Sequence, residues 1–281
     1  ASMSKLMTMV MVFEALKAGT VTLDTEFPIS VNAWKRGGTA SGGSTMFANV
    51  NTKVKLIDLL HGAMIQSAND ACIAIAEGMA GSEEEFAARM TLRAKELGLQ
   101  DAVFRNVTGL PRPENRASVR DLTILARYVV SEFPEYYKIY GKPEFTWNKI
   151  AQQNRNPLLL MGIGADGLKT GNIDEGGFAI VGSAVENKQR LIVALNGCKT
   201  AGDRADDARK LLLWGFRSFE ARALFQPGRS LNACCRCWAR CAKNCRISFS
   251  PWTPPKLPWR KKPCAPARIS STTYGGCARI L

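Results

Sequence analysis

Apolar side chains recur at helical spacing over the first eighteen residues and over five later segments of the chain. Residues 2–18 carry a wide apolar face that ends at Gly19, a residue typical of helix C-termini. The same spacing predicts further helices over 53–66, 69–79, 82–98, 118–131 and 203–220. Between the helices expected over 2–18 and 53–66, residues 20–50 are expected to form short extended segments joined by Gly-rich turns.

Two of the expected helices also carry start signals. Ser82 is followed by three glutamates, which suits the positive end of a helix dipole. Ser118 is followed three positions later by Asp121, the spacing of a helix cap and its reciprocal carboxylate. These signals place the helix starts at Ser82 and Ser118.

The periodicity changes after Asn172. Residues 177–185 and 190–195 are rich in small and β-branched side chains, and Glu186-Asn187 separates them as a turn. We therefore expect an antiparallel hairpin there. The predicted fold class is α+β: an antiparallel β-sheet flanked by helices, with a helical cluster inserted before it and a C-terminal helix packed on it.

Most of the excess positive charge lies at the end of the chain. The 281 residues carry a net charge of +14, but residues 229–281 hold 11 Lys or Arg and no acid. The remainder has 27 basic and 24 acidic residues, a net +3. Seven of the nine cysteines also lie between Cys234 and Cys277. Any electrostatic argument for a polyanionic partner therefore rests on this tail alone.

No run of 18 or more apolar residues occurs, so no membrane-spanning helix is predicted. The apolar start, Leu6 to Phe13, lacks a basic leader and a small-residue cleavage site, so it is not typical of a signal peptide.

His61 is the one histidine of the chain, which excludes metal sites that need several histidines. It lies in an apolar stretch, where a helix histidine usually has a structural role. A serine nucleophile in this protein would therefore need another base, and lysine is the obvious candidate.

Three short motifs supply that chemistry. They are Ser2-Met3-Ser4-Lys5, Ser67-Ala68-Asn69 and Lys169-Thr170-Gly171, and together they fit the S-x-x-K, S-x-N and K-T-G set of penicillin-recognising serine enzymes. Each motif alone is a weak signal. All three in this order make a strong one.

Ser2 and Lys5 are three residues apart on the first predicted helix, so they share one face of it. Lys5 can accept the serine proton only as a neutral amine, which requires a pKa well below 10.4. Burial and a second cation both lower a lysine pKa, and Lys169 is the expected cation.

The other motif residues have complementary roles. Ser67 is expected to relay a proton between Ser2, Lys5 and the leaving nitrogen. Asn69 is expected to hold Lys5 and a substrate amide, while Thr170 offers a hydroxyl to a substrate carboxylate. Gly171 lets a substrate backbone approach the strand. The two oxyanion donors are expected to be the backbone N–H groups of Ser2 and Asn172.

At these residues the chain resembles the D-alanyl-D-alanine carboxypeptidases, which are low-molecular-mass penicillin-binding proteins. The resemblance extends from Ser2 to about Phe225. Beyond the three motifs it includes Asn69-Asp70-Ala71, Phe104-Arg105-Asn106-Val107-Thr108-Gly109-Leu110, Phe145-Thr146-Trp147-Asn148-Lys149, Asn154-Arg155-Asn156, Asp166-Gly167-Leu168 and Leu212-Leu213-Trp214-Gly215-Phe216.

The resemblance implies a β-lactamase/transpeptidase-like fold and a catalytic domain over residues 1–226. It also implies removal of the terminal D-alanine from peptidoglycan stem peptides through a Ser2 acyl-enzyme, with β-lactams as acylating inhibitors. Arg204 is carried over as the cation near the substrate's terminal carboxylate. The implied location is the periplasm or the outer face of the bacterial cytoplasmic membrane, with membrane-surface binding in full-length relatives only. No cofactor, metal or nucleic acid is expected.

The chain departs from the family pattern in two ways. Asn172 stands where the family usually has histidine, which should tune activity if the backbone N–H carries the role. Family chains also have tens of residues before the nucleophile, whereas this one starts at Ala1. We therefore expect an N-terminally truncated fold whose site is recognisable but weakly active or inactive.

Two alternatives remain open from the sequence. A class A-like β-lactamase shares the motifs but needs a deacylating carboxylate, for which Glu132, Glu135 and Glu144 are in range. A protein of another class, a basic Cys-rich nucleic-acid or metal-binding protein, would use the tail.

Residues 227–281 are expected to form a separate tail, disordered or aberrant. The spacing of its cysteines lacks the paired knuckles of zinc modules, and seven cysteines cannot all form disulfides among themselves. Dense Cys, Arg, Trp and Pro without periodicity favour a frameshifted C-terminus. The tail is expected to have little regular structure and few contacts with residues 1–225, so that its deletion leaves the stability of the body unchanged.

Overall fold

The computed structural model of the protein describes residues 2–174, 176–219 and 278–280. By its internal contacts the chain divides into two units, one of Ala1–Gly215 with Ser270–Leu281 and one of Phe216–Ile269. The first unit contains every motif described above. Most of the predicted tail lies outside the described residues.

The helices follow the predicted order. They are η1 (Ser2–Ser4), α1 (Lys5–Lys17), α2 (Val31–Gly37), η2 (Thr39–Ser41), α3 (Leu56–His61), η3 (Gly62–Gln66), α4 (Asn69–Ala80), α5 (Glu83–Glu96), α6 (Val119–Glu132), α7 (Pro134–Tyr137), η4 (Lys138–Gly141), η5 (Pro157–Leu160) and α8 (Ala201–Ser218). The predicted starts are confirmed: Ser82 accepts a hydrogen bond from the Glu85 N–H, and Ser118 forms a reciprocal cap with Asp121.

The strands form one larger sheet and two short pairs. They are β1 (Glu26–Pro28), β2 (Lys53–Lys55), β3 (Glu144–Trp147), β4 (Ile150–Gln153), β5 (Ala165–Ile173), β6 (Gly177–Glu186), β7 (Gln189–Cys198) and β8 (Ala278–Ile280). The larger sheet has the order β5-β6-β7-β8, and every neighbouring pair in it is antiparallel. The predicted hairpin is β6–β7, and the α+β class is confirmed.

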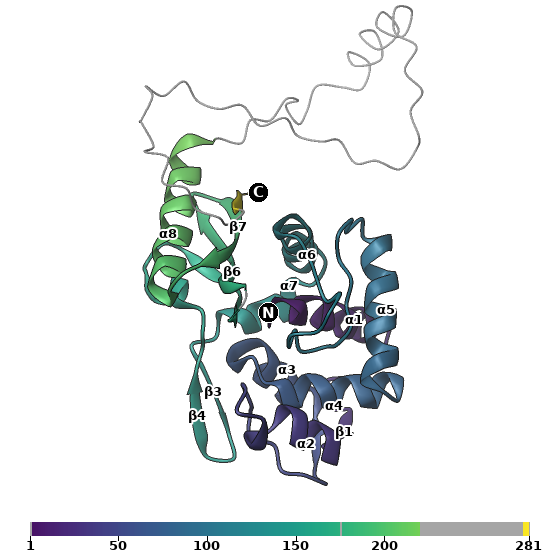
Figure 1. Cartoon of the computed structure of the whole chain (residues 1–281). Helices are drawn as coiled ribbons and strands as arrows, with labels where there is room; N and C mark the ends of the chain where they lie inside the picture. The colour runs from purple at the N-terminus through teal and green to yellow at the C-terminus, as the bar shows by residue number, and fades with distance from the viewer. Residues whose placement is uncertain (1, 175, 220–277, 281) are drawn as a thin grey trace, which may run out of the picture. The chain divides into compact units, whose positions relative to one another are not determined.

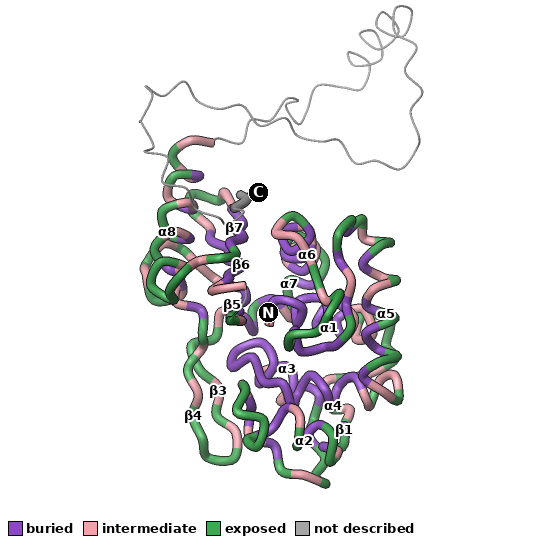
Figure 2. Tube along the Cα trace, in the orientation of Figure 1, coloured by how far each residue is buried: buried purple, intermediate pink, exposed green. Residues whose placement is uncertain are grey.

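Figure 1 shows α8 beside strands β6 and β7, and Figure 2 shows buried residues along both strands. Ala179 and Val181 on β6 belong to the main helical core, as do Ile192 and Ala194 on β7. The intervening buried residues face the other side, where α8 contributes its own buried stripe of Ala205, Ala208 and Leu212. The predicted packing of the last helix on the sheet therefore follows from the two-residue period of the strands.

Three local expectations were wrong. Residues 53–55 form β2, because Val54 is buried between two exposed lysines and pairs with Phe27 on β1. The helix there begins only at Leu56. The 20–50 region contains helix α2, which starts where Ser30 accepts a hydrogen bond from the Ala33 N–H.

The third correction concerns the hairpin turn. The turn of β6–β7 is formed by Asn187 and Lys188, which both have positive φ, one position later than expected. The described residues of the tail, Ala278–Ile280, form strand β8 on β7; the prediction for the rest of the tail lies outside the described residues. No helix in the described ranges is long and apolar enough to span a membrane.

Candidate active site

The first motif begins the chain's first helix. Ser2 and Lys5 lie one turn apart in η1 and α1, and the Lys5 Nζ is 3.1 Å from the Ser2 Oγ. Lys5 is 1% exposed, and its Nζ also donates a 2.7 Å hydrogen bond to the backbone carbonyl of Thr108. A neutral amine that donates one N–H to this carbonyl can turn its lone pair toward the serine hydroxyl. The geometry therefore suits a general base.

The electrostatics of Lys5 point the same way. The pKa of Lys5 is lowered from 10.5 to about 8. Burial is the largest cause and the Arg155 charge acts in the same direction, while Cys72 and Asp70 act in the opposite direction. Burial dominates because a buried ammonium loses its hydration. A substantial fraction of Lys5 is therefore free amine at mildly alkaline pH.

The second motif joins η3 to α4. Ser67 has a left-handed backbone conformation, with φ 66° and ψ 29°, and this reverses the chain between the two helices. Its Oγ is buried, as is the Oδ1 of Asn69, and neither atom has a hydrogen-bond partner in the described part of the chain. Buried polar atoms without partners are costly, so both are positioned to bind a substrate group or water.

Asp70, the residue after the second motif, holds the adjacent loop. Its carboxylate accepts hydrogen bonds from the Thr45 hydroxyl and from the backbone N–H groups of Met46 and Ala48. The Asn69 N–H donates to the Ser44 carbonyl at 2.8 Å. These hydrogen bonds hold the loop over residues 44–48 against the second motif.

The third motif lies on β5. This strand is at one edge of the larger sheet in the described residues, and η1 packs against it. Lys169 and Thr170 are 3% and 6% exposed, whereas Asn172 is exposed. The Lys169 Nζ donates to the Thr170 carbonyl at 2.8 Å. An edge strand beside the nucleophile offers a backbone on which a peptide can pair as a further strand.

The pKa of Lys169 is perturbed more strongly than that of Lys5. Burial lowers its pKa well below 10.5, and the charges of Lys5, Arg155 and Arg204 lower it further. These interactions bring the first and third motifs and Arg204 into one centre. Cys72, two residues beyond Asp70, is buried within reach of both Lys5 and Lys169, and burial raises its pKa to about 11. Residues of the first and third motifs, and Cys72 just beyond the second motif, therefore lie close enough for their charges to interact.

Arg204 lies in the first turn of α8, which Thr200 and Asp203 cap reciprocally. Its guanidinium carbon is 5.7 Å from the centre of the Phe178 ring, and Phe178 pairs with Asn172 across β5 and β6. Its Nε is buried without a hydrogen-bond partner among the described residues, and burial lowers the pKa of the guanidinium. Arg204 is thus a cation held near the Asn172 end of β5.

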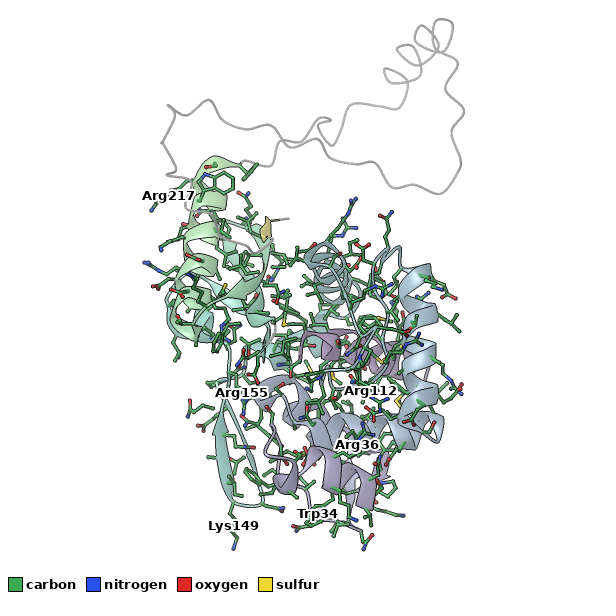
Figure 3. All side chains as sticks on the ribbon, in the orientation of Figure 1. Trp34, Arg36, Arg112, Lys149, Arg155 and Arg217 are labelled. Carbon is green, nitrogen blue, oxygen red and sulfur yellow. The ribbon has the colours of Figure 1, made fainter. Side chains whose placement is uncertain are left out.

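Two site residues were not singled out from the sequence. Thr108 acts through its carbonyl, which no side-chain motif marks. Arg155, labelled in Figure 3, follows the β3–β4 hairpin, where its backbone N–H meets the Ile65 carbonyl and its Nη1 donates to the Ser44 hydroxyl at 2.8 Å. The sequence held a signal for both, since each stands inside a segment that carried the resemblance.

His61 lies apart from this centre. Its ring packs on Phe145 with centroids 5.3 Å apart, and its Nε2 is 3.1 Å from the Lys142 Nζ. Burial and the Lys142 charge lower its pKa to about 4. The His61 ring is therefore neutral, and its contacts are those of a structural side chain.

The carboxylates considered for a β-lactamase also have other partners. Glu132 pairs with Lys17, and Glu144 accepts from the Gln153 side chain, while Glu135 is exposed. None of the three is hydrogen-bonded to Ser2 or Lys5. No cluster of three or more metal-ligating side chains occurs in the described ranges.

A surface hollow of about 420 Å³ lies beside α5, and Glu84, Phe104, Arg105 and Arg112 are among the residues that line it. None of the motif residues lines it. This hollow is therefore separate from the three motifs.

The fold and the convergent motifs together define a transpeptidase-like serine acyl-transfer scaffold. Residues 1–200 match the family model of D-alanyl-D-alanine carboxypeptidase, and the chain belongs to that family. D-alanyl-D-alanine carboxypeptidase DacC of Escherichia coli is 41% identical over 229 residues, which cover 81% of this chain and 57% of the relative. DacD of Salmonella typhimurium is 37% identical and covers 83% of this chain and 60% of the relative. The chain thus spans about three-fifths of the length of these relatives.

Solved structures of penicillin-binding proteins have a similar fold. Penicillin binding protein 5 from Haemophilus influenzae aligns with a TM-score of 0.78 and 37% identity, over 82% of this chain and 67% of that one. Penicillin-Binding Protein D2 from Listeria monocytogenes in its ampicillin-bound form aligns with a TM-score of 0.65 and 29% identity, over 77% of this chain and 86% of that one. The similarity confirms the predicted β-lactamase/transpeptidase-like fold.

Proposed function

We propose that the protein is a serine-type D-Ala-D-Ala carboxypeptidase that removes the terminal D-alanine from peptidoglycan stem peptides. The observation that carries the proposal is the buried Lys5 amine, 3.1 Å from the Ser2 hydroxyl and held by the Thr108 carbonyl. Family membership supports the same substrate class. The proposed partners are D-Ala-D-Ala peptides and, as acylating inhibitors, β-lactams; a relative has been solved in an ampicillin-bound form.

Acylation begins with proton transfer. Neutral Lys5 takes the proton of Ser2, and the Ser2 Oγ attacks the carbonyl carbon of the penultimate D-alanine. The negative charge that develops on the carbonyl oxygen is stabilised by the backbone N–H groups of Ser2 and Asn172. Collapse of this intermediate breaks the C–N bond. The Lys5 ammonium returns its proton to the Ser67 hydroxyl as that hydroxyl passes its own proton to the departing amine of D-alanine, so both groups end in their starting protonation states. Water then hydrolyses the Ser2 ester by the reverse sequence.

Substrate orientation comes from the cationic end of the site. The terminal carboxylate of the peptide is bound by Arg204, the Thr170 hydroxyl and Lys169, since charge-assisted hydrogen bonds are the strongest available here. The buried Asn69 side chain contacts a substrate amide. Gly171 lets the peptide backbone approach β5, where it pairs as an added strand.

The proposed location is the periplasm or the outer face of the bacterial cytoplasmic membrane, where the peptidoglycan substrate lies. The proposed catalytic domain, residues 1–226, contains all of these groups.

The test is covalent labelling. A fluorescent penicillin incubated with the full chain should attach to Ser2, which peptide mapping by mass spectrometry identifies. Ser2→Ala should remove the label, and Lys5→Ala should slow it by about a thousand-fold or more. Ser131→Ala is the matched control, because Ser131 is an exposed residue of α6 whose hydroxyl donates only to backbone carbonyls. Label that persists in Ser2→Ala would refute the assignment.

A second assay separates this proposal from the β-lactamase alternative. With a chromogenic cephalosporin, the carboxypeptidase should give one stoichiometric burst and then a slow adduct release. Rapid, sustained turnover would favour the β-lactamase instead.

A further inference from the structure

Glu83 is a buried carboxylate at the first position of α5, 3% exposed and outside the three motifs. One of its oxygens, Oε2, is 2.6 Å from the Nη1 of Arg36 on α2, a residue labelled in Figure 3. The other oxygen, Oε1, accepts a 3.2 Å hydrogen bond from the Val107 N–H. Burying a carboxylate is costly unless charge and hydrogen bonds compensate, and here both do.

Val107 and Thr108 are held on three sides. The Val107 N–H donates to Glu83, the Val107 carbonyl accepts from the Thr8 hydroxyl at 2.8 Å, and the Thr108 carbonyl accepts from Lys5 at 2.7 Å. Thr8 and Lys5 are one turn apart on α1, so this helix presents both groups to the same segment. Glu83 is the one contact of the three that comes from outside α1.

We propose that Glu83 is a positioning residue for the base of the reaction: by holding Val107 it directs the Thr108 carbonyl at the Lys5 amine. This inference rests on the proposed function, because it concerns the same lysine. Without Glu83 the Thr108 carbonyl moves, and the lone pair of Lys5 loses its fixed direction toward Ser2. A displacement of this size costs a large factor in rate because the reacting atoms must be aligned.

Loss of the Glu83 contact should also change the pH dependence of acylation. A carbonyl acceptor stabilises the charged ammonium more than the neutral amine, so a weaker Thr108 contact lowers the pKa of Lys5. The rising limb of the acylation rate against pH therefore shifts to lower pH while the maximum rate falls. A merely structural role would reduce the active fraction and leave the limb in place.

The experiment compares two changes at one position in the full chain. Glu83→Gln keeps an oxygen for the Val107 N–H and should acylate with labelled penicillin at close to the wild-type rate. Glu83→Ala removes that oxygen and should acylate about 10-fold more slowly, with the limb shifted to lower pH. Burst amplitude corrects each rate for the active fraction. Glu85→Ala is the matched control, since Glu85 is exposed on the same turn and pairs with Arg89.

Two further measurements keep the test decisive. Thr8→Val removes the hydrogen bond that the Val107 carbonyl accepts, and it replaces Glu83→Ala if that variant does not fold. It should also acylate more slowly, with the limb shifted to lower pH. Titration of Lys5 by NMR of ¹³C-lysine-labelled protein, assigned with Lys5→Arg, needs no substrate. An unlabelled wild type would refute the proposed function alone, whereas unchanged Lys5 titration in both Glu83→Ala and Thr8→Val would overturn the positioning role.

Discussion

Lys5 on α1 and Lys169 on β5 are two buried amines, and the charge of Lys5 lowers the pKa of Lys169. Arg155 lowers the pKa of both. Because two buried ammonium groups repel each other, a protonated Lys5 disfavours the charged form of Lys169. The consequence is a site that keeps permanent positive charge on the arginines while it supplies a free amine for proton transfer.

The first prediction concerns pH. Acylation of Ser2 by labelled penicillin should rise with pH, with a limb near pH 8, because Lys5 must lose its proton and its pKa is lowered to about 8. An ordinary lysine would place this limb above pH 10. Rates measured between pH 6 and 9.5, with the folded fraction followed by circular dichroism, check this. A rate that falls across this range would contradict the role of Lys5 as base.

The second prediction concerns stability. The fall in the Lys5 pKa from 10.5 to about 8 corresponds to a destabilisation of about 3 kcal/mol at neutral pH. Between pH 8 and 10.5 the unfolded chain holds a proton on Lys5 that the folded chain has lost, so stability rises with pH in that window. Lys5→Met should therefore be more stable than wild type below pH 8, by up to about 3 kcal/mol, with the gap closing toward pH 10.5.

Urea unfolding at pH 7 and pH 10 measures this gap. Lys17→Met on the same helix is the control: the Lys17 side chain is 61% exposed, so no such narrowing is expected. A Lys5→Met variant that is less stable than wild type at both pH values would show that the contacts of Lys5 outweigh its burial.

The sequence predicted the elements whose signals are local. Helix α1 and the Ser2–Lys5 pair follow from spacing within one helix, and the starts of α5 and α6 follow from caps at Ser82 and Ser118. Strand β2 was missed because its three residues depend on pairing with β1, which is 25 residues away or more and leaves no local signature. Short strands are stabilised by partners and not by their own sequence.

The candidate site divides in the same way. Its motif residues were predicted because their side chains do the chemistry. Thr108 contributes a carbonyl, which every residue has, so only the folded chain shows it facing Lys5. Arg155 reaches the centre because the β3–β4 hairpin returns the chain to Ile65, and that hairpin was not predicted. Arg204 came from the family resemblance, and the structure adds its contact with Phe178.

The third prediction concerns Asp70. Its buried carboxylate accepts four hydrogen bonds, three of them from the loop at Thr45, Met46 and Ala48. Asp70→Ala should destabilise the protein by about 2–4 kcal/mol, because those donors would stay buried without an acceptor. Asp70→Asn should also be destabilising, since its NH₂ group would face N–H donors.

Chemical denaturation of the variants measures the difference. Asp24→Asn is the control, because the Asp24 side chain is 82% exposed in its pair with Lys55, and its effect should stay within about 0.5 kcal/mol. Equal effects at positions 24 and 70 would mean that the Asp70 contacts do not hold the loop.

The last prediction concerns Arg204. Its Nε is buried without a hydrogen-bond partner among the described residues, and we expect a substrate carboxylate to pair with the guanidinium. Arg204→Gln should lower kcat/KM for an acyl-D-Ala-D-Ala peptide by about 10- to 100-fold, the range expected for one charge-assisted hydrogen bond. The same peptide with a C-terminal amide has no carboxylate to bind, so the variant and the wild type should process it at similar rates. Arg209→Gln, an exposed arginine on the same helix, should leave both substrates unaffected. Equal losses on the acid and the amide would place the role of Arg204 in the structure of the β5 edge instead of in carboxylate recognition.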